Sequence, residues 1–444
     1  MSNSTQSSVS EGFTDNPYIN GVLWSGERLP RNTITYSFVN SDSYHWTSNS
    51  VEAVEQALNE WESVANIEFV PVSDNNLDAD FRLSSQGNAY FDIGIGIPGS
   101  VNLAQFGAPG VPNQGEGIFN VEELNNDNFG LEPGQVGYKA LIHEIGHGLG
   151  LGHPHDDSHN SSFAFPGIPD GEAHNAGPNG LNQGVWTIMS YNNGYNDLGF
   201  ESTPMAVDIA AIQHLYGANS DYASGNNIYM LSDLNSYSAI WDTGGNDTIS
   251  AIKLSSEVNV QIDLREAPLN GTNAGGYISY ATGTNTGFTI AHRVKIENAQ
   301  GSIYDDRLTG NKAGNVLQGE KGQDRIVGLE GNDDLYGGYG DDTLVGSNPS
   351  STSSGIQEYD ELTGGGGQDF FILGDRSRAY YQGSGYATIA DFDRLAKDRI
   401  VVFGSSPDYT LEIYRDGTDI FYKEDRIGYV SDVTDLNFSD FDFI

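Results

Sequence analysis

The chain has 444 residues, and its 61 acidic residues against 20 basic ones give a formal net charge of −41. A surface this acidic repels phosphate backbones and anionic bilayers, which argues against a protein that binds nucleic acid or membranes. The sequence has no cysteine, which excludes disulfides, thiol catalysis and thiolate metal sites. The length predicts two or more domains, and no apolar run is long enough for a transmembrane helix.

The first half of the chain has the patterns of a mixed α/β domain. Residues 1–16 are polar, and we expect a flexible N-terminal segment or a removable pro-segment there, without a cleavable signal peptide. Alternating polar and apolar residues predict strands, and apolar residues at helical spacing predict helices. The predicted strands are 33–39, 67–72 and 79–83, and the predicted helices are 48–66, 136–149 and 204–216. Ser48 or Ser50 is the expected N-cap of the first helix, and Gly150 and Gly217 are the expected ends of the other two.

Helical periodicity disappears after Gly217, and a nine-residue period begins at Gly301. Eight successive windows start with glycine: Gly301, Gly310, Gly319, Gly328, Gly337, Gly346, Gly355 and Gly364. The sixth position is Asp or Asn and the eighth is apolar in every window except that of Gly346, which we interpret as a loop that preserves the phase. Residues 373–444 are aperiodic and strand-rich, and we predict a cap there with a hairpin turn at Asp416–Gly417.

Two such windows complete one coil of a parallel β-roll, so alternate turns stack on the same edge of the roll. Each stacked pair of turns presents backbone carbonyls and carboxylates to Ca²⁺, which prefers six to eight oxygen ligands. Without the cation the stacked carboxylates repel one another. We therefore expect this part of the chain to fold only when calcium is bound.

The strongest functional signal runs from His143 to His153 and fits the pattern H-E-x-x-H-x-x-G-x-x-H. His143 and His147 lie one helical turn apart on one face, and Gly150 lets the chain turn back so that His153 reaches the same ion. Three imidazoles leave one zinc coordination position open for water, which is the arrangement of a catalytic site. Glu144 can take the proton of that water, so the pattern indicates hydrolysis of a polarised carbonyl, most simply a peptide bond.

Two further features lie downstream of this motif. Residues 187–191 contain Met189, which beside the zinc motif resembles the methionine that metzincins place in a turn beneath the metal. They also contain Tyr191, whose hydroxyl can ligate the metal or donate to the developing oxyanion. The alternative for Tyr191 is an ordinary packed tyrosine. Three more histidines lie in a polar loop without helical spacing, and we interpret them as solvated residues: His155, His159 and His174.

With these motifs the chain resembles the serralysin family, the secreted zinc metalloproteases of the metzincin clan that carry calcium-binding repeats. The resemblance covers about residues 17–400 and rests on the nonapeptide array and four segments: His143–Pro154, Ile188–Tyr191, Asp208–Asn219 and Trp241–Thr248. It implies one catalytic zinc held by His143, His147 and His153, with Glu144 as the catalytic base. It also implies that Tyr191 is a further zinc ligand that swings away to stabilise the transition state, and that a type I secretion apparatus reads an uncleaved C-terminal signal.

The resemblance also implies several structural calcium ions. One site would join two segments that contribute Ala223, Gly225, Asn227, Asp242, Gly244 and Asp247, with Asn226 and Asn227 where the family usually has Asp and Thr. Lys295, through its carbonyl, and Glu297 would lie near the first calcium of the repeats. The remaining expected calcium ligands belong to the repeats: Asp306, Asn311, Ala313, Asn315, Gly319, Lys321, Gly322, Asp324, Gly328, Glu330, Gly331, Asp333, Gly337, Gly338, Tyr339, Gly340, Asp342, Asp360 and Asp369.

These features predict a multi-domain protein, an α+β metzincin catalytic domain followed by an all-β parallel β-roll with a strand-rich C-terminal cap. The expected domains are 17–217, 218–372 and 373–444, and the last is expected to hold the secretion signal. We expect a secreted, extracellular and monomeric zinc endopeptidase that acts on proteins and peptides, with Ile93–Phe106 as the edge strand of its cleft.

One alternative is a calcium-dependent adhesion or matrix module whose zinc domain is inactive, which the intact Glu144 disfavours. An esterase lacks support, because no serine has the G-x-S-x-G context.

Overall fold

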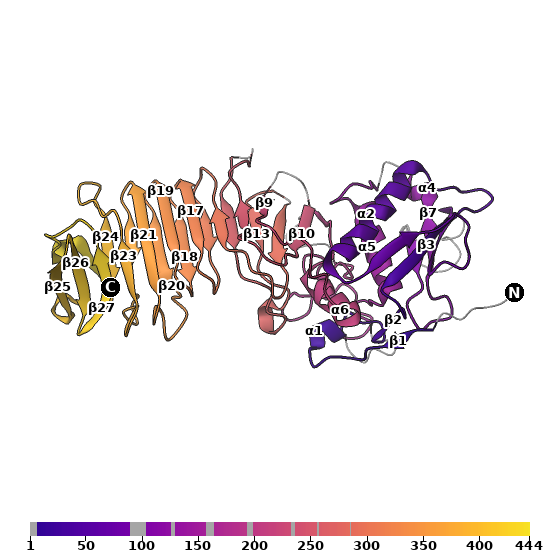
Figure 1. The fold of residues 1–444 in the computed structure, drawn as a ribbon, viewed down its shortest axis with the longest axis horizontal. Helices are drawn as coiled ribbons and strands as arrows, with labels where there is room; N and C mark the ends of the chain where they lie inside the picture. Colours follow the sequence, from indigo (N-terminus) through magenta and orange to yellow (C-terminus); the bar gives the residue numbers. More distant parts are fainter. Residues whose placement is uncertain are drawn as a thin grey trace.

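The computed structural model describes residues 7–88, 104–125, 129–156, 164–192, 199–231, 236–254, 257–284 and 286–444. The molecule is elongated, with helices and strands mixed at the N-terminal end and a stack of strands that runs from there to the C-terminus (Figure 1). This arrangement confirms the expected fold class, an α+β region followed by an all-β region of mainly parallel sheets. Within the described residues, every helix is too short or too polar to cross a bilayer.

The N-terminal region is built on a five-stranded sheet in the order β4-β3-β5-β7-β6. Its strands are β3 (Thr33–Val39), β4 (Glu68–Pro71), β5 (Phe81–Gln86), β6 (Ala104–Phe106) and β7 (Glu116–Asn120). All of them pair in parallel except β6, which lies antiparallel to β7 at one edge. The three predicted strands are thus confirmed. Of the expected edge segment 93–106, residues 93–103 lie outside the described residues and residues 104–106 form this edge strand.

The predicted helices form as α2 (Ser48–Val64), α5 (Val136–Leu149) and α6 (Ala206–Tyr216). The expected N-cap of α2 is wrong, because Thr47 occupies that position: its hydroxyl accepts the Ser50 backbone N–H, and the Ser50 hydroxyl accepts that of Thr47. The indole of Trp61 donates to the Ile142 carbonyl at 3.1 Å, which joins α2 to α5. The shorter elements of this region are β1 (Val9–Ser10), α1 (Pro17–Asn20), β2 (Glu27–Arg28) and α4 (Val121–Leu124).

Two long sheets form the rest of the molecule. The first has the order β28-β24-β22-β20-β18-β16-β12-β13-β14-β10-β8, and the second has the order β25-β26-β27-β23-β21-β19-β17-β15-β11-β9. The strands of the first sheet are β8 (Phe200–Glu201), β10 (Ser236–Ile240), β12 (Val260–Asp263), β13 (Ser279–Ala281), β14 (Gly287–Ile290), β16 (Arg307–Thr309), β18 (Arg325–Leu329), β20 (Thr343–Ser347), β22 (Phe370–Ile372), β24 (Arg399–Val402) and β28 (Phe441–Phe443). Those of the second are β9 (Ile228–Met230), β11 (Thr248–Ser250), β15 (Asn298–Gln300), β17 (Val316–Lys321), β19 (Asp334–Tyr339), β21 (Tyr359–Gly366), β23 (Tyr386–Ile389), β25 (Tyr409–Tyr414), β26 (Gly417–Tyr422) and β27 (Asp425–Val430).

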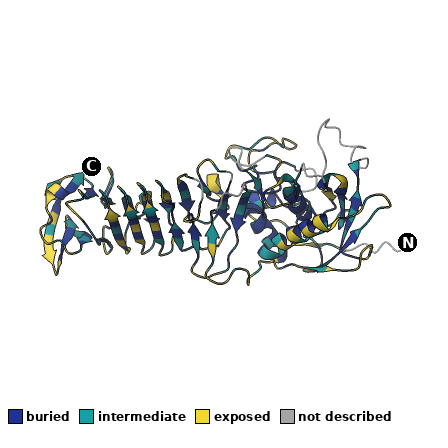
Figure 2. Cartoon of the chain, turned by 90° about the horizontal axis from the view of Figure 1, so that it is seen from above, coloured by how far each residue is buried: buried dark blue, intermediate teal, exposed yellow. Residues whose placement is uncertain are grey.

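The nonapeptide windows alternate between these two sheets, as the period predicts. Leu308 pairs with Ile326 in one sheet and Leu317 pairs with Leu335 in the other, so partners lie two windows apart. These eighth-position side chains are at most 1% exposed and form a thin core between the sheets. Figure 2 shows the resulting alternation of buried and exposed residues along the stacked strands.

Strand pairing crosses both expected domain boundaries. Strand β8, from within residues 17–217, pairs with β10 of the first long sheet. Strands β23 and β24 continue the two sheets beyond residue 372, where the cap was expected to begin. The predicted hairpin is confirmed between β25 and β26, but its turn residues are Arg415 and Asp416, because Gly417 is already paired with Tyr414.

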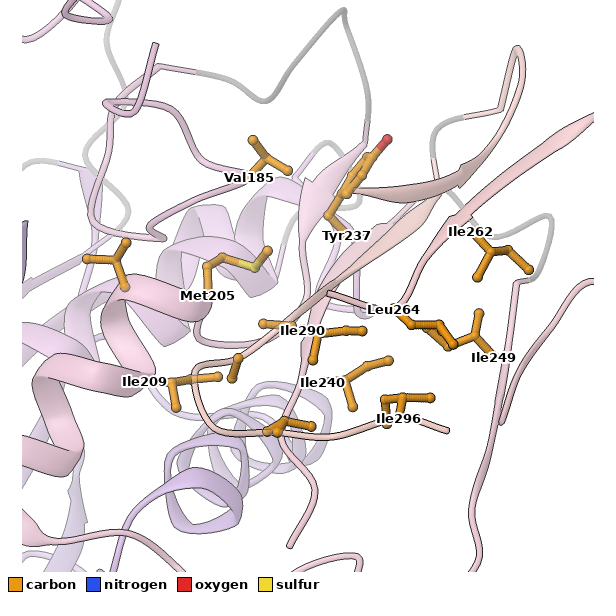
Figure 3. Packing of buried hydrophobic residues seen from close by; sticks show 14 of the residues in the cluster. Val185, Met205, Ile209, Tyr237, Ile240, Ile249, Ile262, Leu264, Ile290 and Ile296 are labelled. Atoms are coloured by element: carbon orange, nitrogen blue, oxygen red, sulfur yellow. The ribbon is translucent and has the colours of Figure 1, made fainter. Parts of the chain in front are cut away.

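Buried apolar residues connect the two regions in one contiguous cluster. Figure 3 shows Met205, which directly precedes α6, and Ile209, which lies in α6, near Ile240 of β10 and Ile290 of β14. The first strands of the roll are therefore packed against α6, within the same cluster of buried residues that contains Leu141 and Ile145 of α5.

A buried ion pair also joins the two regions. Lys139 of α5 lies 2.7 Å from a Glu201 carboxylate oxygen of β8, and their side chains are 11% and 0% exposed. Removal of one partner of such a pair leaves an uncompensated buried charge, which costs about 3–5 kcal/mol. We expect Lys139→Met to destabilise the chain by about that amount, and Lys139→Met with Glu201→Gln to recover most of it. Thermal unfolding of the two single variants and the double variant measures this, and additive losses would contradict the coupling.

Glu60 of α2 supplies a pH-dependent contribution to stability. Burial raises the pKa of Glu60 to about 7, against a weak opposing hydrogen bond from Tyr138. Folding thus favours the protonated form of Glu60. The free energy of unfolding therefore falls as the pH rises from 4.5, the pKa of Glu60 in the unfolded chain, to about 7, its pKa in the folded chain. We expect the free energy of unfolding of Glu60→Gln to exceed that of the parent by about 1–2 kcal/mol at pH 8, and to be equal to it near pH 4. Urea unfolding at both pH values checks this, and a gain independent of pH would contradict it.

Candidate active site

Three histidines converge at the C-terminal end of α5. His143 and His147 lie one turn apart, and Gly150 ends the helix in the left-handed region with φ of 112°. A side chain at Gly150 would meet the carbonyl oxygen of Glu27 at 2.5 Å, so the sharp turn requires glycine. The chain then returns across the helix end and brings His153 to the other two imidazoles.

The geometry of these imidazoles fits one zinc ion. Nε2 of His153 lies 3.2 Å from Nε2 of His143 and 3.0 Å from Nε2 of His147. Tetrahedral zinc at about 2.0–2.1 Å from each nitrogen separates its ligand nitrogens by about 3.3–3.4 Å. The Nδ1 atoms of His143 and His147 lie 2.8 Å from the carbonyls of Ile188 and Leu151, so Nδ1 donates and the Nε2 lone pair faces the common centre.

The surroundings favour neutral imidazole and a basic carboxylate. Burial holds the pKa of His143 well below its usual value, which keeps the ring in the form that binds metal. Burial also raises the pKa of Glu144 to about 8, although a hydrogen bond with the Phe106 backbone lowers it. Phe106 belongs to edge strand β6, so the carboxylate lies between the helix of the histidines and the edge of the sheet.

Met189 and Tyr191 both lie next to the segment that carries the histidines. Met189 is fully buried beneath α5, where its sulfur would be 3.0 Å from a Cβ added at Gly146. Tyr191 is 52% exposed, and its ring centre lies 4.5 Å from that of His153 and 5.8 Å from that of His143. The structure therefore brings both residues to the site that the sequence predicted.

Sequence reasoning did not assign a role to Asp208, which supports the site from α6. Its fully buried carboxylate accepts hydrogen bonds from the Thr187 hydroxyl at 2.6 Å, the Ile188 N–H at 2.7 Å and the Met205 N–H at 2.9 Å. The Ile188 carbonyl in turn accepts from His143. Asp208 thus fixes the turn that orients one imidazole. Two signals in the sequence pointed to Asp208, its place in the first turn of a helix and its place in the Asp208–Asn219 segment, and neither reveals these distant hydrogen-bond partners.

The prediction that His155 is solvated is wrong. Its ring is 5% exposed and stacks on that of His153, with centres 5.1 Å apart and planes 13° from parallel. Its Nδ1 has no hydrogen-bond partner among the described residues. His174 is exposed, as expected, and His159 lies outside the described residues. The error arose because the sequence does not show that this loop folds back over the third histidine.

The first expected calcium site is assembled from two segments. The side-chain amide of Asn227 lies 3.2 Å from the Ala223 carbonyl and 2.5 Å from the Gly225 carbonyl, and its backbone N–H donates to Asp247 at 2.7 Å. The other Asp247 oxygen is buried without a hydrogen-bond partner. Asp242 accepts the Gly244 N–H at 2.8 Å and the hydroxyl of Tyr229. Glu297 is also hydrogen-bonded to this cluster, because its carboxylate accepts the Asp247 N–H at 2.8 Å. The same carboxylate forms an ion pair with Lys295 at 2.9 Å.

The aspartates of the repeats form ladders along both edges of the roll. One oxygen of each accepts the backbone N–H of the corresponding residue in the preceding stacked turn, at 2.7–3.0 Å. The other oxygen is buried without a partner in Asp324, Asp333, Asp342 and Asp369, whose side chains are at most 2% exposed. Burial, with repulsion from neighbouring carboxylates, raises their pKa to about 8, 9, 6 and 7 respectively. Four buried carboxylate oxygens without hydrogen-bond partners are suitable ligands for Ca²⁺, which binds oxygen atoms.

Three of the expected calcium ligands have their oxygens satisfied by protein groups instead. Asp306 accepts from Val260 and from both the backbone and the hydroxyl of Ser302. Asp360 accepts the N–H of Asp333 and the hydroxyl of Tyr381. Asn315 accepts the N–H of Asn311 and donates to the Glu297 carbonyl. These positions offer less to a cation than the four aspartates with unpaired oxygens.

Comparison with known proteins agrees with this geometry. The sequence model of the family described as Matrixin matches residues 27–167, and that described as Peptidase M10 serralysin C terminal matches residues 206–414. Serralysin of Proteus mirabilis is 31% identical over 303 residues, which cover 63% of this chain and 57% of that protein. Metalloprotease AprA of Pseudomonas entomophila is 32% identical over 288 residues, 59% of this chain and 53% of that protein. Serralysin B of Dickeya chrysanthemi is 32% identical over 338 residues, which cover 68% of this chain and 63% of that protein.

The chain thus spans between about half and two thirds of the length of these relatives. The matched stretches contain the three converging histidines and the stacked repeats, which are the features that set the two regions of the fold. From its motifs, its architecture and these similarities, the chain belongs to the serralysin family.

Proposed function

We propose that this chain is a zinc endopeptidase that hydrolyses peptide bonds in proteins and peptides. The observation that carries the proposal is the convergence of three imidazoles, in which the Nε2 atoms of His143 and His147 lie 3.2 Å and 3.0 Å from that of His153. The helix that carries His143 and His147 also carries Glu144. Three neutral nitrogens with an adjacent basic carboxylate are the set that metal-assisted hydrolysis needs.

Each residue has a distinct part in the proposed reaction. Zinc, when held by His143, His147 and His153, supplies a Lewis acid that polarises the scissile carbonyl and lowers the pKa of water to about 7. The Glu144 carboxylate takes the proton from the attacking water and later delivers one to the leaving amine. The Tyr191 hydroxyl donates to the developing oxyanion. Strand β6 offers the backbone of a sheet edge, along which an extended substrate can pair while its carbonyl faces the histidines.

The proposal includes several structural calcium ions in the C-terminal region. The four unpaired aspartate oxygens of the repeats and the cluster around Asp247 support it. We further propose an extracellular location reached through a type I secretion apparatus, where calcium is abundant, and a monomeric state. We keep 17–217 as the catalytic unit and 218–444 as the calcium-binding unit, whose parts 218–372 and 373–444 share continuous sheets.

Digestion of a peptide library tests the proposed activity. We expect cleavage at internal bonds by the purified chain, loss of cleavage with a zinc chelator, and recovery when zinc, but not magnesium, is restored in the presence of calcium. Cleavage that persists after zinc has been removed would contradict the proposal, and so would a zinc-loaded chain that leaves every peptide intact.

A further inference from the structure

A fourth histidine lies beside the three converging ones and has no part in the proposed reaction. Among the described residues, the potential metal-binding group consists of His143, His147 and His153, and His155 does not belong to it. The His155 side chain is nevertheless buried, although the loop that carries it is polar in sequence. The position of this ring therefore depends on the groups against which it packs.

The backbone around His155 is fixed by hydrogen bonds at two consecutive residues. The Pro154 carbonyl accepts the N–H of Phe165 at 2.8 Å, and the His155 carbonyl accepts the N–H of Gly171 at 2.8 Å. Phe165 is itself buried in the core. The imidazole of His155 is thus carried by a backbone that the fold holds in place.

Three rings contact one another at this point. The ring centre of His155 lies 5.1 Å from that of His153, with the planes 13° from parallel, and 5.0 Å from that of Tyr191, with the planes at 51°. The ring centres of His153 and Tyr191 lie 4.5 Å apart. All three separations lie in the range of favourable aromatic pairs, about 4.5–7 Å. Tyr191 therefore packs against two neighbouring imidazoles, of which only one belongs to the metal-binding group.

The place of the Tyr191 hydroxyl depends on these ring contacts. The side chain is about half exposed, and its hydroxyl forms no hydrogen bond with the described residues. Its ring contacts in the described part of the chain are with the imidazoles of His143, His153 and His155. Since no polar group of the described chain holds the hydroxyl, the packing of the ring determines where it lies.

His155 makes these contacts through the faces of its ring. Its Nδ1 atom is buried and has no hydrogen-bond partner among the described residues. A buried polar atom without a partner weakens the folded state, so this nitrogen does not account for the burial of the side chain. An apolar ring of similar size could therefore replace the imidazole and keep the contacts with His153 and Tyr191.

We propose that His155 is a positioning residue for Tyr191. Its ring and that of His153 together form the surface against which the tyrosine packs, and this packing places the Tyr191 hydroxyl where the oxyanion develops. The inference rests on the proposed peptidase reaction and adds to it a residue that contacts neither the zinc ion nor the substrate. Without the ring of His155, Tyr191 gains room to move, and a displacement of about 1 Å lowers the rate by up to about 10²-fold.

Two substitutions of His155 separate the ring from its nitrogens. His155→Ala removes the ring, whereas His155→Phe keeps a ring without nitrogen. At saturating zinc we expect His155→Ala to lower kcat by about 10-fold to 100-fold, with KM and the zinc Kd within about threefold of the parent. We expect His155→Phe to keep kcat within about threefold of the parent. His45→Ala, at an exposed histidine before α2, is the control, and thermal unfolding verifies that each variant is folded.

A double-mutant cycle tests whether His155 acts through Tyr191. Tyr191→Phe keeps the ring contacts but removes the hydroxyl, and we expect it to lower kcat by about 10²-fold. In that background, His155→Ala is expected to lower kcat by less than about twofold further, because there is no hydroxyl left to position.

Several results would overturn this inference alone. They are losses that multiply in the double variant, a His155→Ala variant as active as the control, and a His155→Phe variant as slow as His155→Ala. A zinc Kd weakened by tenfold or more, with full kcat at saturating zinc, would assign His155 to the support of His153 and would also overturn it. A folded, zinc-loaded parent that cleaves no peptide would overturn the proposed function and this inference together.

Discussion

Replacement of Glu144 by Gln is expected to lower kcat by about 10²–10⁴-fold while zinc content and fold are retained. The carboxylate lies near the Phe106 backbone beside the three histidines, and burial raises its pKa to about 8, which makes the ionised form a stronger base than an exposed carboxylate. Glutamine keeps the shape and the hydrogen bond but cannot accept the proton. The loss corresponds to about 3–5 kcal/mol of transition-state stabilisation.

Steady-state kinetics on one peptide, with zinc measured in the same samples, checks this prediction. Glu132→Gln is a suitable control, because Glu132 is exposed before the start of α5. KM is expected to change little, since the group acts in the transition state. If Glu144→Gln cleaves as fast as the control, another residue is the base and the proposed reaction is wrong.

Removal of calcium is expected to unfold the strand-rich region and leave the chain sensitive to proteolysis. An ion present at about 1,000 times its Kd stabilises the folded state by about 4 kcal/mol, so two such ions contribute about 8 kcal/mol. That is comparable to the whole stability of a typical domain, about 5–15 kcal/mol. Without the ions, the unpaired oxygens of Asp324 and Asp342 on one edge would be left buried with no counter-charge.

Far-UV circular dichroism of the full chain, with zinc kept in excess, measures this loss as calcium is removed and restored. Asp324→Asn with Asp342→Asn should raise the calcium concentration needed for refolding. Asp334→Asn is the control, because Asp334 is exposed on β19. A spectrum that stays the same from calcium-free to millimolar calcium would contradict the coupling of binding to folding.

The predictable parts of the molecule are those fixed by local spacing. The spacing of His143 and His147 on one helix, with Gly150 after them, determines much of the zinc geometry before any tertiary contact is known. The nonapeptide period likewise determines which strands pair, because each window repeats the same turn and strand. The helix predicted for residues 136–149, for example, has the same bounds in the structure.

The parts that could not be predicted depend on contacts between distant segments. The burial of His155 follows from a loop that folds back over His153, and the support from Asp208 follows from the packing of α6 beneath the turn at Ile188. The pairing of β8 with β10 depends on a sheet that begins within the N-terminal region. Polar composition and helical spacing carry no information about such partners, since they describe only local preference.

The account depends most on three imidazoles that share one zinc ion. Zinc K-edge absorption of the purified chain, together with its zinc content, tests this most directly. The account predicts one zinc per chain, bound through imidazole nitrogens of three histidines at about 2.0–2.1 Å. A chain that hydrolyses peptides without bound zinc, or whose zinc environment is unchanged in His153→Ala, would contradict it.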